Sequence, residues 1–233
     1  MSDSIMTEID SQTAKSFLLP RHYSGRVPSI SKAFGWYSDA NKLVAVCTFG
    51  KPASNSLCFG ICGQEYSDAV YELNRLCRLD DWKEPLSKFV GYCLRQLKKE
   101  NWIIVSYSDT AMNHHGYIYQ ACNFIYTGYS AKRADYCEIG HKHPRHRTGD
   151  KDTKTNVKKI RSQKHRYVYF CTNDKKLKKL WQESLNYPIL PYPKGDNSNY
   201  VLGEYLADTY IDDDGVEHQT HRTNIYKYMK KLF

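Results

Sequence analysis

The sequence has no apolar run long enough to cross a bilayer, and it does not begin like a secreted protein. Its apolar stretches all fall short of the roughly 20 residues that a membrane-spanning helix requires. The first residues, MSDSIMTEID, are acidic and polar, whereas a signal peptide opens with basic residues followed by an apolar segment. We therefore expect a chain that makes no membrane contact and works in the cytoplasm.

The sequence also lacks the cysteine spacing of a disulfide scaffold or a structural zinc site. Cys47, Cys93 and Cys122 lie within apolar stretches, which favours reduced thiols in the core. Cys58 and Cys62 have no second pair at the spacing of a zinc site, and the histidines do not supply one either. No internal repeat is present, so a solenoid or propeller is excluded.

Aromatic residues and positive charge are abundant. Of 233 residues, 41% are hydrophobic and 14% aromatic, with 20 Tyr, which is enough to pack one main core. The chain has 34 Lys and Arg against 25 Asp and Glu, a formal net charge of +9. This balance favours contact with polyanions.

The positive charge is concentrated in residues 141–166, a segment that is nearly devoid of apolar residues. We expect its cations to contact DNA phosphates, which would give a salt-dependent affinity with little sequence information. The predicted contacts are Arg145, Arg147, Lys158, Lys159, Arg161, Lys164 and Arg166. The alternative is a solvated loop without a ligand.

The hydrophobic pattern predicts a mixed α/β fold. It indicates a helix over 11–19 stopped by Pro20, a hairpin over 34–50 and a strand over 69–79. A helix over 86–97, a strand over 102–105 and a helix over 116–124 with Gly128 as its stop follow. Two further strands are expected in YSAKRADYCEIG and HRYVYFCT, and a last helix in LKKLWQESL. We expect a main domain over residues 1–185, including the insertion 141–166, and a C-terminal extension over residues 186–233.

Polar residues follow the most apolar strand of the sequence. Trp102 to Val105 give way abruptly to Ser106, Ser108 and Asp109, and in α/β proteins such strand ends line functional sites. Asp109 is the best candidate for a proton acceptor. Its alternative role is to cap the helix that follows.

Six ordered motifs connect these elements to a known family. They are HYSGR (His22–Arg26), ELNRL (Glu72–Leu76), SYSDT (Ser106–Thr110), GYIYQACNFIYTG (Gly116–Gly128), HRY (His165–Tyr167) and PYPK (Pro191–Lys194). In these motifs the sequence resembles the Mom family of bacteriophage DNA adenine-modification proteins, a divergent branch of the Gcn5-related N-acyltransferases (GNAT). A long ordered set of motifs is far more specific than a single short one.

The resemblance implies a GNAT-like, mostly antiparallel central sheet flanked by helices. It also implies transfer of a carbamoylmethyl-type (methylcarbamoyl) group to the N6 amine of adenine in double-stranded DNA, which protects phage DNA from host restriction. Acetyl-CoA or a related donor, and iron, are associated with the family. The oligomeric state is left open, with a dimer as one option.

Four residues carry over from the family's motifs as catalytic: His22, Tyr23, Asp109 and Tyr119. From their side-chain types alone, His22 and Tyr23 could be an ordinary exposed pair, and Tyr119 could simply pack on the sheet. A catalytic metal held by His22 and Asp109 is a further expectation of the resemblance.

The donor site is expected at the helix that begins in EPLSKFVG, because helix N-termini bind anions. Its predicted cofactor-binding residues are Ser87, Lys88 and Gly91, with Arg75 and Ser106 lining the same cleft. This segment has a single glycine, which departs from the usual glycine-rich loop of CoA-binding proteins. Two alternatives therefore stay open: a CoA-dependent N-acyltransferase acting on a protein, RNA or small-molecule amine, and a noncatalytic DNA-binding protein.

Overall fold

The computed structural model describes residues 4–22, 27–110, 113–131, 133–138, 156–195, 207–211 and 217–221. The chain divides into two compact units. The first contains residues 1–108, 115–128 and 165–195, and the second contains residues 109–114, 129–164 and 196–233. Residues 186–195, at the start of the predicted C-terminal extension, therefore belong to the first unit.

The N-terminal elements follow the sequence pattern, except that their first strand was not predicted. Strand β1 (Ile5–Ile9) precedes helix α1 (Ser11–Leu18), and β2 (Lys32–Tyr37) and β3 (Leu43–Gly50) form the predicted hairpin. One carboxylate oxygen of Asp10 accepts hydrogen bonds from the backbone N–H groups of Gln12 and Thr13, both at 2.8 Å, and so caps α1. The helix predicted here is confirmed.

The next elements also agree with the prediction, with one addition. Strand β4 (Val70–Arg78), helix α3 (Leu86–Leu97) and strand β5 (Trp102–Asp109) are confirmed. Helix α2 (Asn55–Cys62) was not predicted. The whole of NSLCFGIC is short and mostly apolar, so its pattern did not distinguish a helix from a loop.

The helix predicted over 116–124 is shorter in the structure. Helix α4 covers Tyr117–Ala121 and is followed by strand β6 (Ile125–Tyr129). Asn123 adopts a left-handed backbone (φ +60°), which a helix cannot continue. Gly128 (φ +86°), predicted as a helix stop, lies inside β6. Strand β9 (Lys164–Cys171) and helix α5 (Lys175–Glu183) complete the predicted elements of the first unit.

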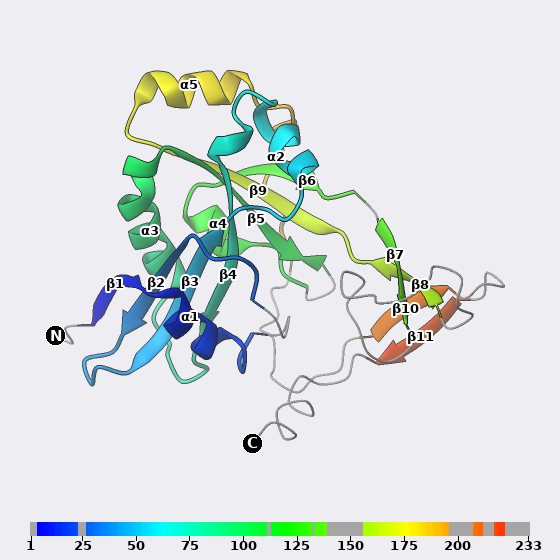
Figure 1. Cartoon of the computed structure of the whole chain (residues 1–233), viewed down its shortest axis with the longest axis horizontal. Coiled ribbons are helices and arrows are strands. Elements are labelled where there is room, and N and C mark those ends of the chain that lie inside the picture. Colours follow the sequence, from blue (N-terminus) through cyan, green and yellow to red (C-terminus); the bar gives the residue numbers. More distant parts are fainter. Residues whose placement is uncertain are drawn as a thin grey trace. The chain divides into compact units, whose positions relative to one another are not determined.

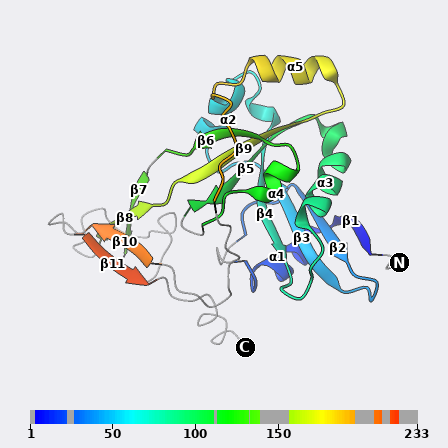
Figure 2. The ribbon, with the colours of Figure 1, turned by 180° about the vertical axis from the view of Figure 1, so that it is seen from behind.

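Seven strands form one sheet in the order β1-β2-β3-β4-β5-β9-β6 (Figure 1). The pairs from β1 to β4 are antiparallel, whereas β4 and β5 are parallel. Side chains alternate between the two faces: Trp102 and Ile104 of β5 pack in the core cluster with α3, and Ile103 and Val105 pack with α2 and α5. Helices α2 and α5 lie together in both views (Figures 1 and 2). The predicted fold class is therefore confirmed.

The second unit contains a separate four-stranded sheet in the order β11-β10-β8-β7. Its strands are β7 (Arg133–Glu138), β8 (Asn156–Arg161), β10 (Ala207–Ile211) and β11 (Glu217–His221), and each neighbouring pair is antiparallel. Part of the basic insertion and part of the C-terminal tail thus pair with each other, which the polar composition of both segments had concealed.

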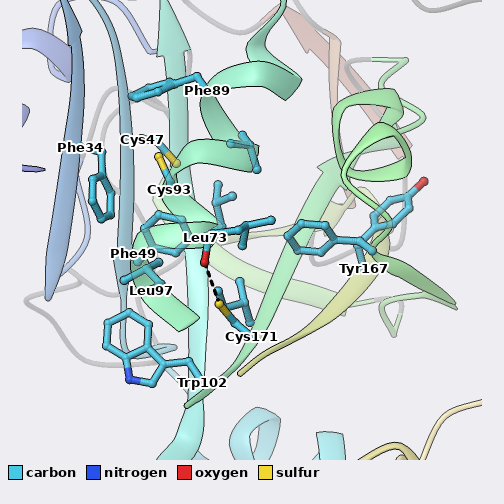
Figure 3. Close-up of a cluster of buried hydrophobic side chains, with 14 of the residues drawn as sticks. Phe34, Cys47, Phe49, Leu73, Phe89, Cys93, Leu97, Trp102, Tyr167 and Cys171 are labelled. Carbon is cyan, nitrogen blue, oxygen red and sulfur yellow. Dashed lines mark hydrogen bonds between the residues drawn. The ribbon is translucent and has the colours of Figure 1, made fainter. Parts of the chain in front are cut away.

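The main core lies between α3 and the sheet and contains two thiols side by side (Figure 3). Cys47 and Cys93 are fully buried, and neither forms a disulfide. Burial, together with the neighbouring Cys47 thiol, raises the pKa of Cys93 well above its usual value. The predicted reduced core thiols are confirmed at these positions. Within the described ranges, no helix has the length and apolarity needed to cross a membrane.

Candidate functional site

The parallel pairing of β4 and β5 ends at Leu73 and Ser106. The Ser106 hydroxyl is buried and donates a hydrogen bond to the Leu73 carbonyl oxygen at 3.1 Å. Beyond this point β4 continues to Arg78 and β5 to Asp109 without further pairing to each other. Ser106 therefore marks the place where the two central strands separate.

A bulge in β4 lies directly after this point. Thr48 pairs with Arg75 and Phe49 with Leu73, so Asn74 is the extra residue. The buried Asn74 side chain accepts a hydrogen bond from Thr48 at 2.6 Å and donates one to the Ser29 carbonyl at 3.1 Å. The ELNRL motif therefore includes an amide that fixes the bulge, and Arg75, a predicted cofactor residue, follows it at a half-buried position.

A pocket of about 360 Å³ runs along one face of α3. Its lining residues are Ser87, Lys88, Gly91, Leu94, Arg95 and Lys98 from one side and Ala121, Cys122, Asn123 and Tyr169 from the other. We call it the α3 pocket. It contains three of the five predicted cofactor residues, whereas Arg75 and Ser106 are not among its lining residues.

The α3 pocket is lined by three cations and by no carboxylate. Lys88 also pairs with Glu84 at 3.1 Å, at the exposed rim of the helix. Arg95 and Lys98 were missed in the sequence, although they follow Lys88 by 7 and 10 positions and such residues share one face of a helix. A cation-lined concavity of this size suits a phosphate-bearing small molecule.

A second group of side chains surrounds α4. We call His115, Tyr119, Tyr126, His165 and Tyr167 the tyrosine–histidine cluster. The Tyr119 ring lies 5.4 Å from that of Tyr167, and the His115 and His165 rings are 5.6 Å apart. Tyr126 and Nδ1 of His165 share a buried hydrogen bond of 3.0 Å.

The polar groups of the tyrosine–histidine cluster are held by one another. The Tyr167 hydroxyl donates to the His115 carbonyl and accepts from the Gln120 amide at 3.2 Å. Figure 3 shows that this hydroxyl points away from the aliphatic core. Burial raises the pKa of Tyr167 to about 12. Burial also lowers the pKa of His165, and the charge of His115 lowers it further. Both groups are therefore neutral at pH 7.

Asp109, the predicted proton acceptor, is buried at the end of β5 in the second unit. Its carboxylate accepts a hydrogen bond from the Ser162 hydroxyl at 2.6 Å and pairs with the Lys164 ammonium at 3.1 Å. Neither partner had been linked to Asp109 in the sequence, because both lie more than 50 positions away. These are contacts with side chains and not with helix N–H groups, so they do not match the alternative role of Asp109 as a helix cap.

The remaining predicted residues fall in different surroundings. His22 follows α1 in the first unit and its backbone N–H donates to the Leu18 carbonyl at 2.8 Å. Tyr23, Arg145 and Arg147 lie outside the described residues. Lys158, Lys159 and Arg161 lie in β8 of the second unit.

Arg166, another of the predicted DNA-contacting cations, is buried. Its guanidinium lies 3.4 Å from the centre of the Tyr187 ring and donates hydrogen bonds of 2.9 Å to the hydroxyl and the carbonyl of Thr127. These contacts use the planar face and one edge of the group. Arg166 thus has a packing role in the first unit.

A metal centre is not supported by the residues that the structure describes. Among them, no group of three or more His, Cys, Asp or Glu side chains could hold a metal ion. His22 and Asp109, the predicted metal ligands, belong to no such group. Within the described ranges the predicted iron therefore has no centre with three protein ligands, and we derive no step through it.

Comparison with known proteins gives one family and several distant folds. A search of curated proteins returns no match. Similar solved structures include a protein assigned as an acetyltransferase from Acinetobacter baylyi ADP1, with 11% identity, coverage of 73% of this chain and 93% of that chain, and a TM-score of 0.46. A protein assigned as an acetyltransferase from Salmonella typhimurium, solved with acetyl-CoA, has 8% identity, coverage of 74% and 96%, and a TM-score of 0.46. An N-acetyltransferase from Staphylococcus aureus Mu50 has 10% identity, coverage of 72% and 97%, and a TM-score of 0.43. At these values the likeness assigns no activity to this chain.

The family match covers somewhat more of the chain. The model of the Mom protein family matches residues 3–194, which include the α3 pocket, the tyrosine–histidine cluster, Asp109 and all six motifs. The resemblance inferred from the motifs is thereby confirmed. The chain belongs to the Mom protein family.

Proposed function

We propose that this chain is a transferase that attaches a carbamoylmethyl-type group to the N6 amine of adenine in DNA, and so protects phage DNA from host restriction. The observation that carries the proposal is the family match over residues 3–194. The cation-lined α3 pocket supports it further, because a transferase needs a place for its donor as well as for its acceptor.

The α3 pocket is the proposed site of an acyl-CoA-type donor. Lys88, Arg95 and Lys98 would neutralise its phosphates, and the volume of about 360 Å³ lies within the range of small-molecule sites. Acetyl-CoA is the first compound to test for binding, since its phosphates match the three cations without requiring the glycine-rich loop that EPLSKFVG lacks. Transfer of its own acetyl group would give an N6-acetyl adduct with CoA thiol as the leaving group, so a carbamoylmethyl adduct requires a donor that already carries that group.

The acceptor amine needs help from the protein. The lone pair of adenine N6 is delocalised into the ring, so the amine must be oriented, must lose a proton as the new bond forms, and must meet a stabilised electrophile. We assign proton acceptance to Asp109. Its two contacts with Ser162 and Lys164 fix the position of the carboxylate.

Two further roles follow from the same proposal. Tyr119, held between Phe124 and Tyr167 at ring distances of 5.4 Å, would orient the substrate. His22 and Tyr23 keep the catalytic role that the family motif implies. Double-stranded DNA is the proposed partner, with Lys158, Lys159 and Arg161 of β8 contacting phosphates. Because N6 is engaged in base pairing and is sterically difficult to reach for chemistry in a duplex, the target base would be extruded.

Mass spectrometry of nucleosides from plasmid DNA tests the proposal directly. DNA from cells that express the protein should contain an adduct of deoxyadenosine. Asp109→Asn should abolish the adduct and keep DNA affinity, because the variant retains the size of the side chain and loses only the charge. Asp39→Asn, which changes an exposed turn carboxylate, is the matched control and should leave the adduct level unchanged.

Two results would overturn parts of this assignment. Unmodified DNA, obtained with soluble protein in a host that supplies the donor, would remove DNA modification as the function. Transfer from acetyl-CoA to a protein or small-molecule amine in the same preparation would instead favour the N-acyltransferase alternative. A near-normal adduct level in Asp109→Asn would remove Asp109 as the proton acceptor.

A further inference from the structure

Residues 187–195, which include the PYPK motif, are tied across α4 and β6. We call this segment the strap. The Leu190 N–H donates to the Tyr126 carbonyl at 3.0 Å, and the Gln120 amide donates to the Pro193 carbonyl at 3.1 Å. The backbone of Gly195 both accepts from and donates to the Tyr117 hydroxyl, at 2.5 and 3.1 Å. The strap is therefore part of the first unit, and nothing proposed above uses it.

Two tyrosines where the strap meets α4 are held in an unusual way. An exposed tyrosine commonly packs its ring on the protein and leaves its hydroxyl in water. Here the Tyr192 hydroxyl donates to the Phe124 carbonyl at 2.7 Å and the Tyr117 hydroxyl is bound by Gly195. Their side chains nevertheless remain 40% and 37% exposed. The hydroxyls are fixed by backbone groups and the rings are left accessible.

Fixed aromatic rings are well suited to stacking. A side chain that has already lost its rotational freedom pays little further entropy when a flat ligand binds to it. Tyr117 and Tyr192 lie near opposite ends of α4, whose five residues span roughly 7 Å.

The surface around these rings fits a polyanion. Residues 115–128 and 184–195 contain no Asp or Glu, and Lys194 is exposed beside Tyr192. Ile189 and Leu190 of the strap are also exposed, at 66% and 40%. Aromatic rings with an adjoining cation and no carboxylate are the combination that binds unstacked nucleotides, since every base offers a flat face and every link carries a phosphate.

We infer that Tyr117 and Tyr192 form a stacking platform for unpaired nucleobases of DNA, with Lys194 contacting the adjoining phosphate. This inference rests on the proposed function, because it names how the DNA substrate is held. Ala121, at the last turn of α4, lines the α3 pocket, and Tyr117 begins the same helix. A base held on the platform therefore lies within one short helix of the proposed donor.

Fluorescence of a single-stranded oligonucleotide containing 2-aminopurine tests the platform. The emission of this adenine analogue falls when it stacks on an aromatic ring. The wild type should quench it on binding, and Tyr117→Leu with Tyr192→Leu should weaken binding at least tenfold and abolish the added quenching. Tyr117→Phe with Tyr192→Phe keeps both rings and should retain most of the affinity.

Two controls separate stacking from other causes. Phe59→Leu removes an exposed aromatic ring of α2, outside the strap, and should bind the oligonucleotide like the wild type. Thermal unfolding of each variant checks that the strap has not detached, because the Phe and Leu variants lose the same hydroxyl contacts. If the Leu and Phe variants lose affinity equally, the hydroxyl contacts and not the rings are responsible, and the platform is wrong.

The experiment distinguishes failure of the stacking platform from failure of the proposed function. Undiminished binding and quenching in the Leu variants would overturn the platform, even where nucleoside analysis finds the adenine adduct. Loss of binding in the Leu variants would support the platform even where no adduct forms. A change of oligomeric state in the Leu variants, with DNA binding intact, would assign these rings to contact with a second copy of the chain and would also overturn the inference.

Discussion

The α3 pocket takes six of its ten lining residues from positions 87–98, whereas the tyrosine–histidine cluster joins side chains from α4, β6 and β9. One hydrogen bond of the cluster connects residues 52 positions apart. A region made by one helix tolerates local changes, because its shape depends on few distant contacts. A region assembled from three elements depends on each of them, so it should be far more sensitive to a single added atom.

The largest expected effect is a glycine substitution within the tyrosine–histidine cluster. Gly116 has φ +75°, and a Cβ at this position would lie 2.5 Å from the Tyr167 ring. Gly116→Ala combines a left-handed alanine with overpacking against a buried ring, so we expect it to lower the free energy of unfolding by about 3 kcal/mol. Urea-induced unfolding measures this change.

The matched substitution in the α3 pocket should have the opposite sign. Gly91 lies within α3, and a Cβ there would meet only the Arg95 guanidinium, at an ordinary 3.5 Å. Gly91→Ala should therefore raise the free energy of unfolding by about 0.5–1 kcal/mol, because alanine is the better helix former. Equal destabilisation by both substitutions would contradict the contrast between the two regions.

A tenfold effect on ligand affinity is expected from the cations of the α3 pocket. Arg95→Gln together with Lys98→Gln should weaken binding of CoA about tenfold and reduce its dependence on salt, because charge-assisted contacts to phosphate are lost. Calorimetric titration measures the affinity. Lys99→Gln removes a neighbouring exposed lysine that does not line the pocket, and an equal loss in that variant would argue against a specific site.

The last expected effect is a change of stability with pH. Burial, with the charge of His115 second, lowers the pKa of His165 below its usual 6.5, so the unfolded chain takes up this proton more readily than the folded one. The stability from His165 is complete above pH 6.5 and is lost as the pH falls below it, by at most about 1.4 kcal/mol per pH unit. Unfolding at pH 7.5 and 5.5 measures the loss.

The variant His165→Gln isolates this contribution, because other groups also titrate between these two pH values. Its stability should change less than that of the wild type over the same interval. A parallel change in the two proteins would show that the cluster does not disfavour the protonated imidazole.

The two regions also differ in how far the sequence could predict them. Periodic apolar residues located α1, α3 and β5. The anion site expected at the start of α3 included Ser87, Lys88 and Gly91, and all three line the α3 pocket. The end of α4 was predicted too late, because the pattern does not reveal that Asn123 adopts a left-handed backbone. Periodicity describes one element at a time.

Contacts between distant segments could not be predicted in the same way. Nothing near Asp109 in the chain indicates that Ser162 and Lys164 would hold its carboxylate. Positive charge likewise did not indicate that Arg166 is buried against Tyr187. Such pairs depend on the arrangement of the strands, and a single sequence carries no direct record of it.

The strap also sets a limit on how early the protein can fold during synthesis. Its contacts with α4 join residues 73 and 78 positions apart, and the segment 129–164 of the second unit is made in between. The surroundings of α4 therefore cannot be completed until residue 195 has emerged from the ribosome. Until then, a nascent chain exposes β6 and the tyrosine rings around α4. A pause in translation before the codon for residue 195 should therefore increase aggregation.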